Sequence, residues 1–313
     1  MSGDIGLDFD QQSLVILNLV IALMMFGVSL TLRPEDFRRI LKQPKAPAIG
    51  LLAQFLLLPA LTCLGTWIFN VPAELALGMM LVAACPGGAF SNVMTWLARG
   101  SVAVSVSMTG ISSLAATILT PLNFALYSGL NPNTRVLYQE ISIDPISLLL
   151  LILLVLGVPI VLGMSLGTRF PALAQRSEKV LRVVSLVIFL AFIALAFTKN
   201  FGLFLEHFQT FFALVVIHNA GALSIGYGLS RLTKLPQADR RAVTLEVGIQ
   251  NSGLALVILF TFMPQAGGMM LIAAFWGVWH LVAGLTLSNI WARIPITDGS
   301  EAVYLQEASA NAP

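Results

Sequence analysis

The sequence predicts an all-α polytopic membrane protein with nine transmembrane helices. Hydrophobic residues make up 57% of its 313 residues and charged residues only 10%, a composition that soluble globular proteins do not have. Nine apolar runs can be marked, most of them long enough to cross about 30 Å of hydrocarbon as helices. The runs cover residues 13–31, 46–69, 75–97, 101–128, 146–167, 183–198, 210–231, 242–262 and 269–292.

The basic residues predict the orientation, because cytoplasmic loops of membrane proteins collect Lys and Arg. All but Arg135 and Lys199 of the 17 basic residues fall in alternate loops, on one side of the predicted membrane. This split supports the count of nine, since miscounting one helix would break the alternation. We therefore expect the N-terminal segment 1–12, which is acidic and not a signal peptide, outside the cytoplasm. The polar tail 294–313 is expected to be disordered and cytoplasmic.

Polar residues interrupt two of the runs near the middle of the membrane. In the third run, the stretch CPGGAFSN at residues 85–92 places a proline and two glycines before a serine and an asparagine. Proline removes a backbone donor and glycine weakens a helix, so we expect this helix to break here. The eighth run carries the polar stretch EVGIQNSG at residues 246–253, which predicts a second irregular segment. Two interrupted helices at corresponding places indicate the binding site of a secondary transporter.

Glu246 alone, of the 15 acidic residues, lies well inside an apolar run. A carboxylate at this depth costs several kcal/mol, so we expect it to serve the function of the protein. Pairing the third run with the eighth also pairs the first with the sixth, the second with the seventh and the fourth with the ninth. The partners cross in opposite directions, so the predicted repeat is inverted, and the fifth run has no partner.

Four motifs give the sequence a specific resemblance to the bile acid:sodium symporter family. They are AQFLLLP at 53–59, CPGGAFSN at 85–92, EVGIQNSG at 246–253 and WHLVAG at 279–284. The resemblance runs from about Leu14 to Arg293 and implies a panel domain and a core domain in which two broken helices cross. Family members of the ten-helix type have one further N-terminal helix, which this sequence lacks, and that difference explains the unpartnered fifth run.

The resemblance also implies two sodium sites that share Glu246, so that cations rather than an arginine would offset its charge. The positions that match the first site are Ser91, Asn92, Ser105, Thr109 and Glu246. Sodium is a hard cation that takes oxygen ligands, and the i, i+4 spacing of Ser105 and Thr109 places both hydroxyls on one helix face. The positions that match the second site are Gln54, Glu246, Val247, Ile249 and Gln250.

The expected substrate is an organic anion held near the first break. The positions that match the substrate cavity of the family are Gly87, Gly88, Ala89, Asn251 and His280. Ala89 departs from family members that have threonine there. Two sodium ions against one carboxylate, together with the N-termini of half-helices, leave positive charge that favours a carboxylate or sulfonate. The family implies bile acids in vertebrates and smaller acids such as pantoate or pyruvate elsewhere.

These residues also have simpler structural interpretations. Ser105 and Thr109 could bond to backbone, and Gln54 could join two helices. The break at 86–88 could be a packing kink. His218 is expected to be structural, and His280 could equally pack between helices. The two cysteines, Cys63 and Cys85, are expected to be small buried residues rather than a disulfide or a metal site.

The sequence therefore predicts a sodium-coupled symporter of organic anions that works by alternating access, with its transporter domain over residues 13–293. We expect a monomer in the inner (plasma) membrane, with no enzymatic activity, no nucleic-acid partner and no ATP site. The open alternative is a proton-coupled exporter of an oxyanion such as arsenite, with Cys85 as ligand and Glu246 as proton carrier. An intramembrane hydrolase using Ser252 or Ser91 with His280 is disfavoured, because no carboxylate pairs with the histidine.

Overall fold

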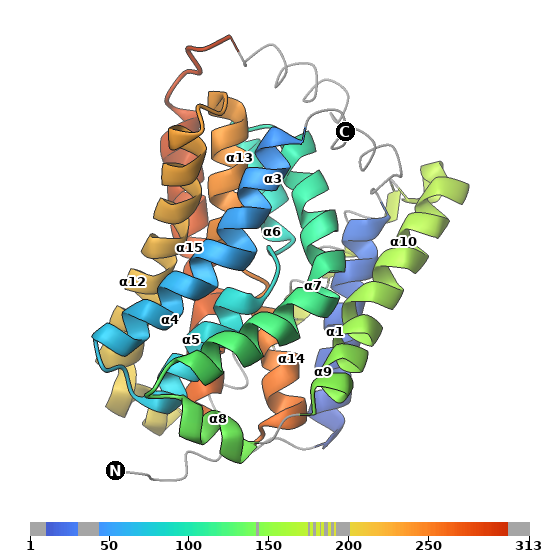
Figure 1. Cartoon of the computed structure of the whole chain (residues 1–313). Helices are drawn as coiled ribbons and strands as arrows, with labels where there is room; N and C mark the ends of the chain where they lie inside the picture. Colours follow the sequence, from blue (N-terminus) through green and yellow to red (C-terminus); the bar gives the residue numbers. More distant parts are fainter. Residues whose placement is uncertain are drawn as a thin grey trace.

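The computed structural model describes residues 11–30, 44–141, 144–174 and 201–299, with isolated positions between 176 and 191. These residues form helices, which confirms the predicted all-α class (Figure 1). The helices are α1 (Gln11–Ser29), α3 (Lys45–Leu52), α4 (Leu58–Ile68), α5 (Ala73–Ala84), α6 (Phe90–Leu97), α7 (Val102–Leu130), α8 (Arg135–Ile141), α9 (Pro145–Ile152), α10 (Val158–Arg169), α12 (Phe201–Leu232), α13 (Gln237–Gly248), α14 (Ser252–Phe262) and α15 (Gly267–Ala292). Two π-helical turns, η1 (Ala53–Leu57) and η2 (Leu153–Gly157), join α3 to α4 and α9 to α10.

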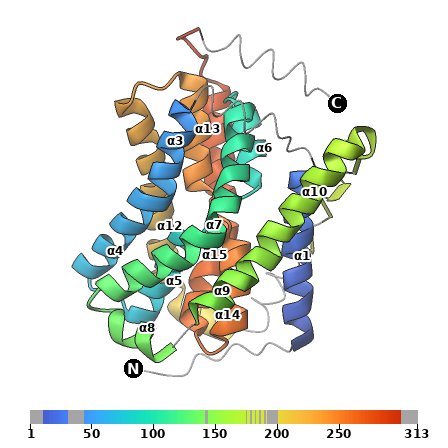
Figure 2. The ribbon, with the colours of Figure 1, turned by 45° about the vertical axis from the view of Figure 1, so that its right-hand side comes forward.

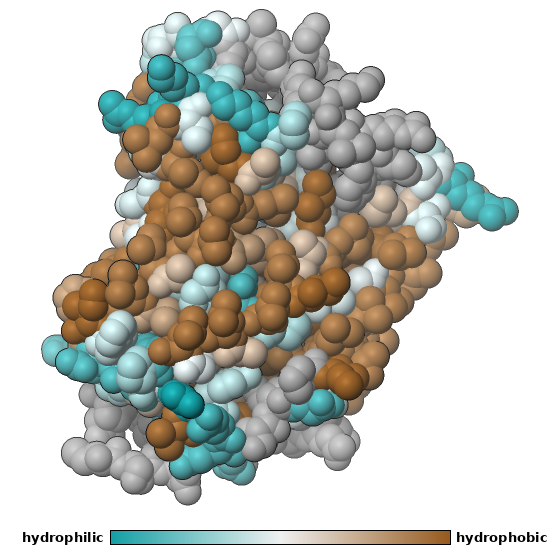
Figure 3. Space-filling view, in the orientation of Figure 1, coloured by the Kyte–Doolittle hydropathy of each residue, from teal (hydrophilic) through white to brown (hydrophobic). Residues whose placement is uncertain are grey.

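Five helical segments of the described chain are long and apolar enough to cross a membrane, as expected of a polytopic membrane protein. These segments are Lys45–Ile68, Val102–Leu130, Ile146–Arg169, Gln209–Leu232 and Gly267–Ala292. Figure 3 shows the result on one face, where apolar side chains form a broad belt between two more polar ends. Most of the predicted helix 183–198, and the termini 1–10 and 300–313, lie outside the described residues. The count of nine helices therefore stays a prediction.

Some bounds differ from the sequence prediction, and α12 differs most. The helix begins at Phe201, whereas the apolar run begins at residue 210. At about 1.5 Å per residue, a helix of this length is longer than the hydrocarbon thickness, and its apolar membrane-spanning segment is Gln209–Leu232. The apolar run marks only the part of a helix that faces lipid or core. The short helix α8, which is outside the predicted spans, was missed for the same reason.

Proline explains the two π-helical turns. Pro59 and Pro159 each lie just after such a turn. A proline has no N–H and its ring clashes with the carbonyl four residues earlier, so the helix widens locally. In the first case that carbonyl belongs to Phe55, and it accepts a hydrogen bond from Asn123 Nδ2 of α7 at 2.7 Å. Gln54, which lies in the same turn, is buried and points toward the end of α5.

Two helices of the bundle are interrupted, at residues 85–89 between α5 and α6 and at residues 249–251 between α13 and α14. Each interruption falls within a polar stretch that the sequence analysis singled out. Pro86 and the glycines that follow it cannot maintain helical hydrogen bonding, which ends α5. Helix α13 ends at Gly248, because the next residue, Ile249, has an extended backbone (φ −108°, ψ 94°).

The two interruptions pair with each other through the backbone. Gly88 N donates to Ile249 O at 2.6 Å, and Asn251 N donates to Pro86 O at 2.9 Å. The two hydrogen bonds are reciprocal, because each interruption gives one donor and one acceptor to the other. This pairing satisfies backbone groups that would otherwise be unbonded in the middle of the bundle. The residues between the two bonds form an isolated antiparallel bridge, Gly87 with Gln250.

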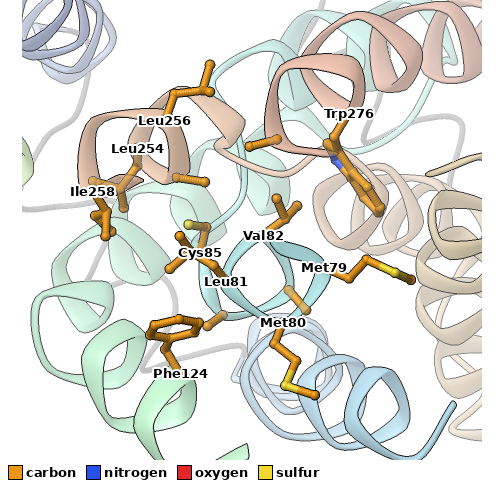
Figure 4. Close-up of a cluster of buried hydrophobic side chains, with 14 of the residues drawn as sticks. Met79, Met80, Leu81, Val82, Cys85, Phe124, Leu254, Leu256, Ile258 and Trp276 are labelled. Carbon is orange, nitrogen blue, oxygen red and sulfur yellow. The ribbon is translucent and has the colours of Figure 1, made fainter. Parts of the chain in front are cut away.

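Apolar packing around α5 holds the crossing in place. The residues of α5 from Leu75 to Ala84 are all buried, as are those of α14 from Ser252 to Phe260. Figure 4 shows buried apolar side chains of these two half-helices together with Phe124 of α7 and Trp276 of α15; the other labelled residues are Met79, Met80, Leu81, Val82, Cys85, Leu254, Leu256 and Ile258. A helix that is apolar on all sides is expected to be buried.

Helix α1 packs along α10 and forms a layer at the side of the bundle (Figures 1 and 2). Two glycines of α10 allow the close approach, since small residues let membrane helices come together. A Cβ on Gly163 would lie 2.7 Å from Phe26 O, and one on Gly167 would overlap Leu30 O. At these two glycines, the backbone of α10 packs directly against the backbone of α1.

Arg241, near the start of α13, brings three loops together at one end of the molecule. Its Nη1 donates to Ala98 O at 2.6 Å and Trp291 O at 3.1 Å, and its Nη2 donates to Ile294 O at 2.8 Å. These carbonyls lie at the ends of α6 and α15, where a cation is favourable. The loops after α6 and α15 and the loop before α13 thus share one side, as the alternation of basic loops requires.

Candidate ion and substrate site

Glu246 lies in the last turn of α13, where its side chain is fully buried. Its carboxylate occupies the space next to the interruption of the other broken helix. A Cβ on Gly87 would lie 2.2 Å from Glu246 Oε1 and 2.8 Å from Cδ. Any side chain at position 87 would therefore compete with the carboxylate for the same space, which is why the site needs glycine there.

Three hydroxyl groups donate hydrogen bonds to this carboxylate. Ser91 Oγ of α6 lies 2.5 Å from Oε2, and Ser105 Oγ of α7 lies 3.2 Å from the same atom. Thr109 Oγ1, one turn further along α7, lies 2.8 Å from Oε1. Hydrogen bonds to a charged group are stronger than neutral ones, so these three donors stabilise a charge that burial alone would make very unfavourable.

Asn92 completes the group of residues predicted for the first sodium site. Its Oδ1 lies 2.8 Å from Ser105 Oγ and 3.2 Å from Thr109 Oγ1. Each of these hydroxyls has one proton but at least two acceptor oxygens within reach, so acceptors outnumber protons in the cluster. A hard cation is the species that such a group of oxygens fits best.

Thr95 belongs to the same cluster, although the sequence analysis did not include it. Its Oγ1 donates to Ser105 Oγ at 3.3 Å, and it is fully buried. Thr95 follows Ser91 by four residues in α6, so both hydroxyls lie on one helix face. That i, i+4 spacing, which marked Ser105 and Thr109 on the next helix, was the signal that could have found it.

The residues predicted for the second sodium site surround the interruption of α13. Gln54 Nε2 donates to Gln250 Oε1 at 2.8 Å and to Cys85 O at 2.9 Å. Gln250 Nε2 in turn donates to Val247 O at 2.7 Å. Gln54 Oε1 is buried and has no hydrogen-bond partner. A buried carbonyl oxygen without a partner is costly, and a cation would satisfy it.

The residues predicted to line the substrate cavity fall into two groups. The crossing brings residues 87–89 and Asn251 together through the backbone pairing described above. Ala89 lies just before α6, is buried, and has a helical backbone conformation. Asn251 caps α14, because its Oδ1 accepts a hydrogen bond from Leu254 N at 3.0 Å. This structural role was not anticipated.

His280 is buried on α15, and its Nδ1 has no hydrogen-bond partner. One turn further along, Gly284 lies against the interruption of α13, since a Cβ there would lie 2.7 Å from Ile249 Cδ1. His280 therefore belongs to the helix that flanks the crossing. His218 has a different position, with Nε2 2.7 Å from Thr62 Oγ1 and its ring edge-to-face on Trp276. These contacts join α12 to α4 and α15, in agreement with a structural role.

The two cysteines are free, and Cys85 is fully buried. Within the described ranges, no group of three His, Cys, Asp or Glu side chains could hold a metal ion. The oxygens around Glu246 come mainly from hydroxyls and amides, which are ligands of hard cations such as sodium rather than of transition metals.

The fold and the site together describe a multi-pass membrane protein with a charged, oxygen-lined centre between two broken helices. The family model described as the sodium bile acid symporter family matches residues 18–207. The chain therefore belongs to the sodium bile acid symporter family.

Three relatives illustrate the range of similar proteins. The uncharacterized sodium-dependent transporter YocS of Bacillus subtilis is 31% identical over 278 residues, which cover 88% of this chain and 83% of YocS. A probable chloroplastic sodium/metabolite cotransporter of rice, BASS1, is 32% identical over 89% of this chain and 66% of its own length. The bovine P3 protein is 35% identical over 75% of this chain, and the match spans 48% of that longer protein.

Proposed function

We propose that the protein is a sodium-coupled symporter of an organic anion. The observation that carries this proposal is the cluster around Glu246 of α13, in which three hydroxyl groups from α6 and α7 donate hydrogen bonds to a buried carboxylate. Two further oxygen-bearing side chains of α6, Asn92 and Thr95, bond to these hydroxyls. Sodium-dependent transport in the names of relatives agrees with it. The names of these relatives also support a transporter rather than an enzyme.

The chemistry of the cluster suits an ion that enters and leaves. The hydroxyl groups of Ser91, Ser105 and Thr109 lie within hydrogen-bond distance of the carboxylate. When sodium binds, these hydroxyls would rotate and present their lone pairs, which requires no backbone movement. A second sodium between Gln54, Gln250 and the carbonyls of Val247 and Ile249 would use the unpartnered Gln54 Oε1.

The proposed substrate is a small carboxylate or sulfonate at the crossing. Helices α6 and α14 both begin there, so the partial positive charge at two helix N-termini favours an anion. Two sodium ions against one carboxylate would add to this charge. The proposed substrate contacts are residues 87–89, Asn251 and His280. Among larger organic anions, bile acids are also candidate substrates.

We further propose that transport proceeds by alternating access. The layer of α1 and α10 would act as the panel, and the helices around the crossing would form the core. The reciprocal backbone bonds between the two interruptions support an inverted repeat. In this proposal the protein is a monomer with nine helices in the inner (plasma) membrane. Its N-terminus lies outside and its C-terminus lies in the cytoplasm.

Uptake into proteoliposomes tests the proposal. The purified protein is reconstituted, and uptake of a panel of radiolabelled organic anions is measured under a sodium gradient, a proton gradient or neither. We expect uptake of at least one anion under the sodium gradient and none when potassium replaces sodium. Transport driven by protons alone would instead favour the exporter alternative, and Cys85→Ser would then be expected to impair oxyanion transport.

The two proposed ion sites can be separated by mutation. Ser105→Ala and Thr109→Ala remove oxygens from the first site, and Gln54→Ala removes one from the second. Each change should raise the sodium concentration for half-maximal uptake, by roughly three- to tenfold for one lost ligand. Sodium titrations of uptake at fixed substrate measure this. Two coupled sites would be contradicted if the wild type showed a sodium Hill coefficient near one and neither the first-site nor the second-site substitutions changed it.

Ala89→Thr tests the proposed substrate position. Ala89 has a helical backbone, so a threonine hydroxyl there is not in the usual capping conformation and remains free to face the crossing. One added hydrogen bond is worth up to roughly tenfold in affinity. We therefore expect the ranking of small carboxylates in competition uptake to change by about that factor, with sodium affinity unchanged. An unchanged ranking would place the substrate elsewhere.

A further inference from the structure

Asn219 of α12 is a buried amide that none of the sites above includes. Its side chain is only 1% exposed, and its Nδ2 donates to Gly248 O at 2.7 Å. Its Oδ1 is also buried and has no hydrogen-bond partner. A polar side chain between membrane helices is unfavourable unless it bonds, so the contact with Gly248 explains why an amide is found here.

The carbonyl of Gly248 needs an external donor because of the interruption. Gly248 is the last residue of α13, and the last carbonyls of a helix have no partner within it. In a continuous helix the donor would be Ser252 N, which instead donates to Gln250 O at 2.9 Å. Only the nitrogen of an amide side chain can donate to a carbonyl, which fixes how Asn219 is oriented. Asn219 therefore supplies the donor that the interruption removed.

Gln54 makes the same kind of contact with the other broken helix. Its Nε2 donates to Cys85 O at 2.9 Å, at the C-terminal end of α5, and its own Oε1 is buried without a partner. Each broken helix thus has its carbonyl end bonded by one amide side chain from a continuous neighbour. The two neighbours, α3–α4 and α12, are also the second and seventh predicted runs, which the predicted repeat pairs.

Helices α12 and α13 also pack closely beside this hydrogen bond, along the part of α12 that follows Asn219. A Cβ on Gly248 would lie 2.2 Å from Leu223 Cδ2, one turn after Asn219. Further along the same face, a Cβ on Gly226 would lie 2.9 Å from Thr244 Cα. Glycines let the two backbones meet, since they have no side chain to keep the helices apart. The hydrogen bond therefore adds a polar tie to a tightly packed contact between α12 and the end of α13.

We propose that Asn219 is a positioning residue for the second cation site. Gly248 lies between Val247 and Ile249, whose carbonyls belong to that site in the proposed function on which this inference rests. Those two carbonyls are bonded by groups of the broken helices themselves, whereas Gly248 O is held from α12. Fixing Gly248 O fixes the peptide planes beside it, so both ligand oxygens keep their direction. Asn219 acts through the backbone and does not touch the cation.

The test compares Asn219→Leu with the wild type in purified protein. Leucine has a similar volume and cannot donate. We expect the sodium concentration for half-saturation, measured with radioactive sodium, to rise roughly three- to tenfold. Amide hydrogen exchange of residues 249–251, measured without sodium, should become faster. The matched control is Asn289→Leu, an exposed amide of α15 that donates to Leu285 O at 2.8 Å within its own helix, and it should change neither quantity.

Two further variants separate positioning from a general loss of stability. Asn219→Ala adds no bulk and replaces the leucine variant if that protein does not fold. The double variant Asn219→Ala with Gln54→Ala reports coupling, since changes that act on one site are not additive. We expect the double variant to lose little more sodium affinity than the weaker-binding single variant. Additive losses would show independent effects and would overturn the assignment.

The measurements distinguish this inference from the proposed function. An unchanged rate of amide hydrogen exchange at residues 249–251 in Asn219→Leu would overturn the positioning role, whether or not sodium affinity changes. Faster exchange with unchanged sodium affinity would overturn the link to the cation site. A wild type that binds no sodium would overturn the proposed function and with it that link, while exchange would still decide whether Asn219 holds the interruption.

Discussion

Glu246→Gln should abolish sodium-driven uptake while leaving a folded, inserted protein. The glutamine keeps the shape of the side chain and one carbonyl oxygen, so the hydrogen bonds from Ser91 or Thr109 can partly persist. It removes the negative charge that both proposed sodium ions share, and no other acidic side chain lies in the described part of the cluster. Uptake of the transported anion into proteoliposomes under a sodium gradient is the measurement.

Glu74→Gln is the matched control for this prediction. Glu74 lies in the first turn of α5, and its Oε1 accepts a hydrogen bond from Gly268 N at 2.7 Å, which a glutamine oxygen can also do. We expect its uptake to stay close to that of the wild type. Sodium-driven transport by Glu246→Gln at the wild-type rate would contradict the shared-carboxylate model.

Gly87→Ala should weaken sodium binding by about fivefold or more, because overpacking a tight site typically costs about 1–3 kcal/mol. The added methyl group would overlap Glu246 Oε1, which three hydroxyl groups hold in place. The carboxylate must then move away from the hydroxyls that would share the cation with it. Sodium binding to purified protein, together with its thermal stability, measures the effect.

The control is Gly129→Ala, in α7. A Cβ there would meet no atom within 4 Å, so the substitution should leave sodium binding unchanged. Sodium affinity in Gly87→Ala equal to that of the wild type would mean that the carboxylate is not confined as described. Equal losses in both variants would mean that glycine substitution disturbs the helices in general, and would remove the support for a specific contact.

Much of the fold could be predicted because a helix that crosses a membrane needs a long apolar run, which is easy to recognise in a sequence. Apolar runs marked most of the long helices, and Pro86 with its two glycines marked the first interruption, since proline cannot donate to the helix. The position of Glu246 was informative because a carboxylate at that depth requires partners. The hydroxyls of Ser105 and Thr109 could be placed on one face from their spacing alone.

Other features depend on which helices touch, which a single sequence does not encode directly. Asn219 and Asn123 were not identified from the sequence, and only the packing of α12 and α7 shows that they bond to freed carbonyls. The capping role of Asn251 was also hidden, because it depends on where α14 begins. The apolar run at 210–231 matches the membrane-spanning segment Gln209–Leu232, and only the extension of α12 back to Phe201 was not predicted.

The backbone pairing of the two interruptions limits where the molecule can flex. Separating Gly88 from Ile249 and Asn251 from Pro86 would leave four peptide groups without partners in a region that has little water to replace them. Because these bonds join backbone groups of both broken helices, we expect the crossing to move as one rigid unit. The boundary between α1 and the bundle has no comparable ties among its described contacts. In the proposed alternating-access mechanism, sliding along that boundary would open the proposed ion sites to either side while the crossing itself stays intact.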